Sequence, residues 1–195
     1  GWSRTEISIA FTFMTLGLLI AGPVIVGRLS DRIGVRAVAL ASIPLFALTL
    51  FGLQFIQQGP EGAPGPVLLW VGYLAMAFLG AGTSPITYTR AVNAWFDRNR
   101  GLALGLTLAG TGAMGIILPM ILGRVAPEFG WRGGFITLAI LAILAWPVVA
   151  LLLKNAPAVG PQAQAGVAPG ASLGEAVINY RFWALGFAFL ILALG

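Results

Sequence analysis

The sequence predicts an all-α membrane protein, a polytopic bundle of helices that each cross a lipid bilayer. Hydrophobic residues make up 58% of its 195 residues and charged residues only 9%, against about 25% charged residues in an average soluble domain. The 11 Lys or Arg and 6 Asp or Glu cannot cover the surface of a soluble protein of this length. Soluble and disordered chains are therefore excluded.

The charged residues also divide the chain into long uncharged segments. A membrane-spanning helix needs about 20 apolar residues, and helices are required because lipid cannot hydrogen-bond backbone N–H and C=O groups. Five segments are 21 to 28 residues long, and a sixth of 14 residues is cut off by the chain end. We therefore predict five complete spans and the start of a sixth, at residues 7–27, 37–60, 62–89, 101–123, 133–153 and 182–195.

Local signals mark two of the helix starts. Ser3 and Glu6 have the spacing of a capping box, in which each residue satisfies a free backbone N–H of the first turn. The first helix should therefore begin near Arg4. Pro66 suits the first turn of the third helix, where its missing N–H costs nothing.

The chain changes character after the fifth span. Residues 155–171 are rich in Ala, Gly and Pro, which predicts a flexible linker. Ser172 and Glu175 form a second capping-box pattern, so residues 172–195 should hold a short interfacial helix and the last, truncated span. Both chain ends look cut, because the chain starts at Gly1 and ends at Gly195 within an apolar run.

The basic residues favour one orientation in the membrane. The cytoplasmic side of a membrane protein carries an excess of Lys and Arg in its short loops. Alternate loops here hold eight and three of them: Arg28, Arg32, Arg36, Arg90, Arg98, Arg100, Lys154 and Arg181 on one side, and Arg4, Arg124 and Arg132 on the other. We therefore expect a multi-pass protein of the cell membrane (inner or plasma) with residues 28–36 cytoplasmic and Gly1 outside. Basic residues this dispersed do not indicate a nucleic-acid partner.

Several chemistries are excluded by composition. The chain has no Cys and no His, which removes disulfides, Cys/His metal sites and Ser-His-Asp or Cys-His catalysis. Its acidic residues fall in predicted loops or at helix ends. We therefore expect no metal, no cofactor and no enzymatic activity, and a membrane-integral enzyme is the least favoured alternative.

The first cytoplasmic loop carries the most specific motif. Residues 27–36 read GRLSDRIGVR, in which Gly34 permits a turn with positive φ and Gly27 permits close helix approach. This loop resembles the G-x-L-x-D-R-x-G-x-R loop of the major facilitator superfamily. The matched positions are Gly27, Leu29, Asp31, Arg32, Gly34 and Arg36.

Two further blocks resemble the monocarboxylate and oxalate/formate branch of that superfamily. They are residues 95–105, WFDRNRGLALG, and Gly130-Trp131-Arg132. The resemblance implies a partial superfamily fold: residues 1–154 would form the N-terminal bundle without its first helix, and residues 172–195 would begin the C-terminal bundle. It implies transport by alternating access, with the matched loop as a latch in which Arg36 pairs with an acid, here Asp97. Asp31 would contact the other half of the transporter.

Polar residues within the spans are candidates for the substrate site. Arg90 could pair with an acid such as Asp97 near the cytoplasmic boundary, or contact an anionic substrate at the inner end of a cavity. Hydroxyl side chains could line that cavity, although Ser and Thr more often bond to their own helix. These candidates are Thr12, Thr15, Thr83, Thr87, Tyr88, Thr107 and Thr111.

The fourth span carries small residues at four-residue spacing, a pattern that lets helices approach closely in lipid. Gly101, Gly105 and Ala109 form this stripe, and Pro119 predicts a bend. Pro119 follows Leu118 rather than a glycine, so the G-P-x-x-G-G run of drug/proton antiporters is not met.

The leading functional prediction is a secondary transporter of a small solute, favouring a carboxylate-type organic anion, with a proton or counter-anion as a possible coupling partner. The bilayer and the rest of a longer transporter would be its other partners. The alternatives are an efflux transporter for drugs or other solutes and a non-transporting membrane scaffold or receptor.

Overall fold

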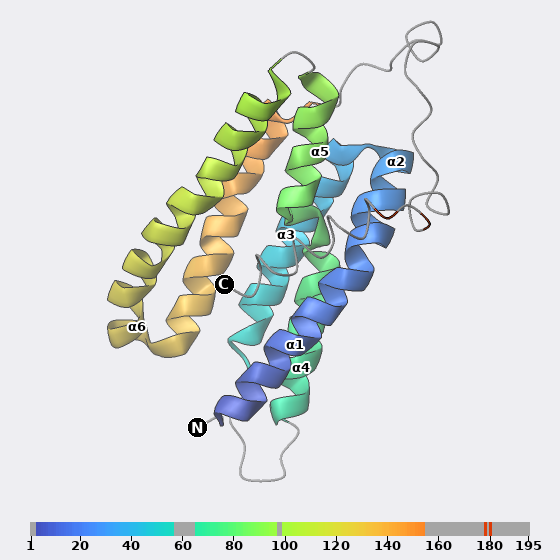
Figure 1. The fold of residues 1–195 in the computed structure, drawn as a ribbon. Helices are drawn as coiled ribbons and strands as arrows, with labels where there is room; N and C mark the ends of the chain where they lie inside the picture. The colour runs from blue at the N-terminus through green and yellow to red at the C-terminus, as the bar shows by residue number, and fades with distance from the viewer. Residues whose placement is uncertain (1–2, 57–64, 97–98, 155–177, 179, 181–195) are drawn as a thin grey trace, which may run out of the picture. The chain divides into compact units, whose positions relative to one another are not determined.

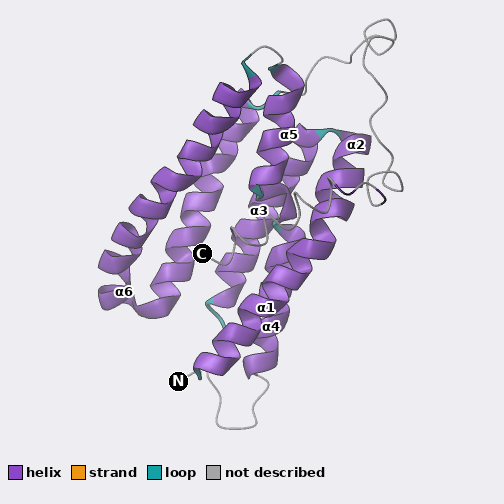
Figure 2. Cartoon of the chain, viewed as in Figure 1, coloured by secondary structure: helices purple, strands orange, loops and turns teal. Residues whose placement is uncertain are grey.

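The computed structural model describes residues 3–56, 65–96, 99–154, 178 and 180, and its described part is helical throughout with short connections and no strand (Figure 2). The elements are α1 (Arg4–Ala21), the π-helix η1 (Gly22–Leu29), α2 (Ser30–Ile33), α3 (Val35–Leu53), α4 (Gly65–Leu79), the 3₁₀ turn η2 (Ala81–Thr83), α5 (Pro85–Trp95) and α6 (Arg100–Leu152). The chain divides into two compact units, residues 1–156 and 157–195. The predicted linker and the second capping box lie outside the described residues.

The first helix begins where the sequence predicted. Ser3 is the N-cap of α1, its hydroxyl accepts from the backbone N–H of Glu6, and the Glu6 carboxylate accepts from the Ser3 N–H at 2.7 Å. This reciprocal pair satisfies two backbone donors that no earlier helical turn can reach. Helical structure then continues to Ile33 because Gly22 and Pro23 shift it to π geometry instead of ending it. Pro23 has no N–H to give to the preceding turn, which favours a local change of register.

The third predicted span, residues 62–89, is two helices rather than one. α4 ends at Leu79, η2 makes a tight turn, and α5 starts with Pro85 in its first turn. Ser84, the residue before that proline, has extended backbone angles (φ −68°, ψ 153°). Proline disfavours helical angles in the residue before it, and this accounts for the break.

The fourth and fifth predicted spans are the two arms of α6. The arms run side by side in opposite directions in Figure 1 and turn at Gly130 (φ 65°, ψ −170°). Only glycine adopts these angles readily. The arms are longer than residues 101–123 and 133–153 because Arg124 and Arg132 remain helical. A helix ends where its backbone hydrogen-bond pattern is interrupted, and a single charged side chain does not interrupt that pattern. The backbone also stays helical through Pro119.

Two helix pairs build the core. α1 packs in parallel with α4: the Trp70 indole donates to Glu6 O at 3.0 Å, and an added Cβ on Gly17 would lie 2.7 Å from Ala77 Cβ. α3 packs antiparallel to the second arm of α6, and the Trp146 indole donates to Leu40 O at 3.0 Å. The buried side chains between these helices include Leu50, Leu53, Met76 and Ala139.

The helix directions place the basic residues at two ends of the first unit. One end, the motif end, contains α2, the end of α5 and the end of α6. There Trp95 donates to Lys154 O and Arg36 donates to Ala150 O. At the opposite end Arg132 donates to Gln54 O at 3.0 Å. Alternate loops therefore meet at the same end, as the charge count requires.

Candidate functional site: a charged cluster at the motif end

Gly34 separates α2 from α3 within the matched loop. Its φ is 87°, the positive value that the sequence led us to expect, and its N–H donates to Ser30 O at 3.0 Å. The turn therefore closes on one glycine and presents Asp31 and Arg32 on a single helical turn. By contrast, an added Cβ on Gly27 would meet only Gly22 O at 3.9 Å, so no close helix approach depends on that position in the described residues.

Arg90 joins α5 to this loop. Its guanidinium forms an ion pair with the Asp31 carboxylate. The same side chain donates to Val26 O at 2.8 Å and more weakly to Gly27 O at 3.4 Å. We call these groups the Arg90 cluster: the Arg90 and Asp31 side chains with the carbonyls of Val26 and Gly27. A guanidinium suits this position because its fixed fork can reach a carboxylate and a carbonyl together.

The two members of the ion pair differ in exposure. The Arg90 side chain is 37% exposed and that of Asp31 is 65% exposed. Solvent therefore screens the pair, and much of the stabilisation by Arg90 comes from its carbonyl contacts. Of the predicted roles for Arg90, pairing with an acid is the one the structure shows, and the acid is Asp31.

Arg36 extends from the start of α3 to the last turn of α6, where its Nη2 donates to Ala150 O at 2.9 Å. A cation at the carboxyl end of a helix interacts favourably with the unpaired carbonyls and the helix dipole. Asp97, the predicted partner of Arg36, lies outside the described residues.

The predicted hydroxyl candidates lie on separate elements. Four donate to backbone carbonyls of their own helical segments: Thr12 to Ser8 O, Thr15 to Phe11 O, Thr83 to Gly80 O and Thr107 to Ala103 O, at 2.7 to 3.0 Å. Thr111 similarly donates to Leu108 O. Each hydroxyl keeps free acceptor capacity, and Thr12, Thr15 and Thr111 are exposed.

Thr87 differs from the other candidates. It is fully buried, at 0% exposure, and its hydroxyl has no hydrogen-bond partner. The hydroxyls of Ser30 and Ser84 are also buried without a partner. Tyr88, the neighbour of Thr87, is partly exposed. The structure thus brings Asp31 and Arg90 together but leaves the hydroxyl candidates on α1, the η2–α5 segment and α6.

The small-residue stripe of α6 faces open space in the described residues. An added Cβ on Gly101 or Gly105 would meet nothing within 4 Å, and Ala109 and Pro119 are exposed. Their role in helix packing stays a prediction.

Sequence reasoning missed three features of this end of the molecule. The π-helix η1 was not foreseen, although the Gly22-Pro23 pair is a signal for a local change of helix register. The contact between Arg90 on α5 and the Val26 carbonyl within η1 joins positions 64 residues apart in the sequence. The Trp95 indole bonds to Lys154 O at 3.1 Å, and no local pattern links those two positions.

Long apolar helices and a charge-rich end define a multi-pass integral membrane protein. Arg4–Ile33, Val35–Leu53 and Arg100–Leu152 are each long and apolar enough to cross a bilayer, and the last contains two arms. The chain belongs to the Major Facilitator Superfamily, which it matches over residues 1–195.

The relatives that this chain resembles are named as transporters, but their names give different solutes or none. The chain is 32% identical over 161 residues to MFS-type transporter 1 of Ophiocordyceps sp., covering 76% of this chain and 32% of that protein. It is 30% identical over 165 residues to the riboflavin transporter RibJ of Trypanosoma cruzi (84% and 33%), and 31% identical over 170 residues to mouse monocarboxylate transporter 11 (86% and 34%). The chain thus spans about a third of the length of these relatives. No solved structure matches it.

Proposed function

We propose that this chain contributes most of one helical bundle of a secondary active transporter, which moves a small solute across the membrane by alternating access. The observation that carries the proposal is the family match over the whole chain, together with the charged Arg90 cluster at one end of the bundle. The long helices supply rigid bodies that can rock, and the cluster ties the end of one of them, Arg4–Ile33, to the shorter helix α5. Residues 155–171 would link this bundle to the next.

The favoured substrate is a small organic anion of the carboxylate type. The support is the likeness to monocarboxylate transporter 11. A larger heterocyclic solute is the second candidate, because another relative is named a riboflavin transporter. An enzymatic role has no support from these relatives, and a non-transporting scaffold or receptor is the remaining alternative.

The experiment is uptake by the full-length protein in proteoliposomes. Radiolabelled lactate, pyruvate and riboflavin would be tested separately, with and without an inward proton gradient. Carboxylate uptake above protein-free vesicles supports the proposal, and riboflavin uptake alone would replace the substrate class. Binding without uptake of any solute would favour the receptor alternative.

We further propose that the Arg90 cluster, with Asp97, stabilises one of the two access states, the outward-open state. The cluster joins η1, α2 and α5 at the predicted cytoplasmic end, so its rupture would loosen the end that must open inward. Asp31→Asn should shift the protein toward inward access, measured by cysteine labelling of the cytoplasmic entrance. Unchanged labelling and unchanged uptake in Asp31→Asn and Asp97→Asn would reject this role.

A further inference from the structure

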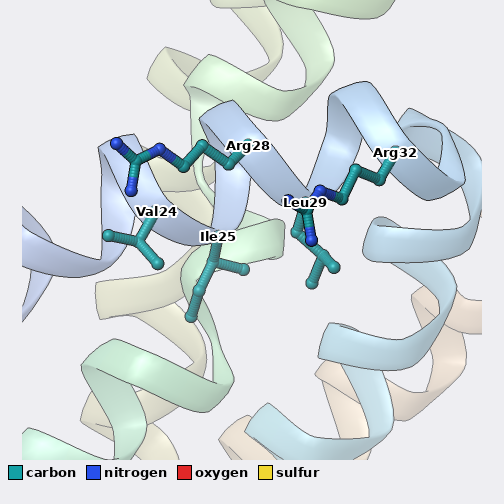
Figure 3. A pocket seen from close by; sticks show the side chains of 5 residues that line it. All are labelled: Val24, Ile25, Arg28, Leu29 and Arg32. Atoms are coloured by element: carbon teal, nitrogen blue, oxygen red, sulfur yellow. The ribbon is translucent and has the colours of Figure 1, made fainter.

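The surface of the motif end also has a hollow that is separate from the Arg90 cluster. It has a volume of about 330 Å³ and is lined by Val24, Ile25, Arg28, Leu29 and Arg32. Figure 3 shows the two arginine side chains above three aliphatic side chains, all from η1 and α2. The hollow is therefore amphipathic, with an apolar floor and two guanidinium groups at its rim.

The two arginines at the rim are not neutralised locally. Asp31 is the only acidic residue between residues 28 and 36, and its carboxylate already forms an ion pair with Arg90. Within the described part of the chain, Arg28 and Arg32 have no hydrogen bond or ion pair from their side chains, and both are exposed. Two positive charges four residues apart repel each other, so an anion between them would be stabilised.

The floor of the hollow identifies the kind of anion. Val24 is 48% exposed and Leu29 is 39% exposed, and both belong to a helical stretch long and apolar enough to cross a bilayer. A freely dissolved phosphate would gain nothing from these side chains. A membrane lipid has both an anionic group and an apolar group. Its phosphate can accept bidentate arginine hydrogen bonds, and its acyl chains can cover the aliphatic residues.

We propose that this hollow is a binding site for an anionic phospholipid, with Arg28 and Arg32 holding the phosphate and the aliphatic floor contacting the glycerol backbone and upper acyl chains. On the predicted orientation the lipid belongs to the cytoplasmic leaflet, whose anionic surface attracts basic residues next to a span by about 1 kcal/mol each. Asp31 stays with Arg90, and this leaves the site with a net positive charge.

A lipid-quenching experiment tests the site directly. The chain contains no cysteine, so Val24→Cys carries a fluorophore at a single defined position in it. Full-length protein, with any cysteine outside this chain replaced, is reconstituted in equimolar phosphatidylcholine and phosphatidylglycerol, and either lipid is brominated in turn. Brominated phosphatidylglycerol should quench the label more strongly. Leu19→Cys, 70% exposed on α1 and outside the hollow, should show no such preference.

Charge variants distinguish a site from general surface attraction. Arg28→Gln with Arg32→Gln should lower the phosphatidylglycerol preference at position 24 by about thirtyfold, while Arg4→Gln with Arg124→Gln removes the same charge elsewhere and should preserve it. Neither Arg28 nor Arg32 forms a hydrogen bond or ion pair with another described side chain. The variant Arg28→Lys with Arg32→Lys keeps both positive charges, so a correctly folded protein should retain part of the phosphatidylglycerol preference. Equal quenching by both lipids would overturn the proposal, as would a label shielded from both lipids by polypeptide.

Discussion

Arg90 connects two helical segments through one side chain, and its contacts set the size of the effect expected from its loss. The guanidinium pairs with Asp31 and also donates to Val26 O. Exposed ion pairs contribute roughly 0.2–1 kcal/mol, whereas a hydrogen bond that involves a charged group contributes about 1.5–3 kcal/mol. Removal of Arg90 should therefore cost more than removal of Asp31.

A double-mutant cycle measures this difference. Arg90→Met should lower the thermal midpoint of the protein in detergent more than Asp31→Asn does, and the coupling energy between the two should be about 0.5 kcal/mol. Arg90→Lys keeps the charge but loses the fork geometry, so it should fall between them. Equal effects of Arg90→Met and Asp31→Asn would mean that the carbonyl contacts contribute nothing.

Removal of the Thr87 hydroxyl should stabilise the protein, whereas removal of Arg90 should destabilise it. Its hydroxyl is buried without a partner, and a buried unpaired hydroxyl destabilises the folded state by about 1–3 kcal/mol. Thr87→Val, of similar shape, should therefore raise the thermal midpoint, while Thr87→Ser should not. If Thr87→Val lowers stability or abolishes uptake without unfolding, the hydroxyl has a partner in the working protein, as the predicted substrate role requires.

At the scale of the elements, glycines fix where helices meet and where they turn. An added Cβ on Gly82 would lie 2.4 Å from Ser42 Oγ and 2.8 Å from Ser42 Cβ. Gly82→Ala should therefore force η2 away from α3 and cost about 1–3 kcal/mol. Gly52→Ala in α3 and Gly123→Ala in α6 have no such neighbour and should be neutral or stabilising, because alanine favours helix. Thermal unfolding of the three variants, followed by tryptophan fluorescence, checks the order. Equal destabilisation by all three would refute the packing argument.

The turn of α6 depends on backbone conformation instead of contact. Gly130 has φ 65° and ψ −170°, and a non-glycine residue there costs on the order of 1–3 kcal/mol. Gly130→Ala should lower the unfolding midpoint even though an added Cβ there meets nothing within 4 Å. The matched change Gly123→Ala, in the helical first arm and also without a neighbour, should not. A Gly130→Ala protein as stable as the parent would show that the turn between the arms of α6 can form without a positive φ at residue 130.

The sequence predicted the helices better than it predicted their interruptions. Runs without charge located every helix in the described residues that is long and apolar enough to cross a bilayer, because lipid excludes charged groups and requires helical backbone. Those runs could not show that Arg124 and Arg132 remain helical or that η2 divides the third span. Likewise, the motif identified Asp31, but its partner Arg90 lies 59 residues away. Tertiary packing decides such a pairing, and no local pattern encodes it.

At the scale of the whole molecule, the contacts between helices make the orientation testable at described positions. α2 lies at the motif end, whereas the turn of α6 lies at the end marked by the contact of Arg132 with Gln54. Ser30, in the matched loop, is only 5% exposed and a poor labelling site. Ile33 and Phe129 are 50% and 68% exposed, and the sequence has no competing cysteine.

Ile33→Cys and Phe129→Cys should therefore react from opposite sides of the membrane. Because the motif end carries the larger share of basic residues, a membrane-impermeant maleimide added to intact cells should label Phe129→Cys only, and Ile33→Cys should react after the cells are permeabilised. A double variant should carry one label before permeabilisation and two after it. Labelling of both positions from outside would contradict the opposed ends of the bundle, whereas labelling of Ile33→Cys alone would keep the fold and reverse its orientation. The reversed result would also move the proposed lipid site to the outer leaflet, where anionic lipid is scarcer.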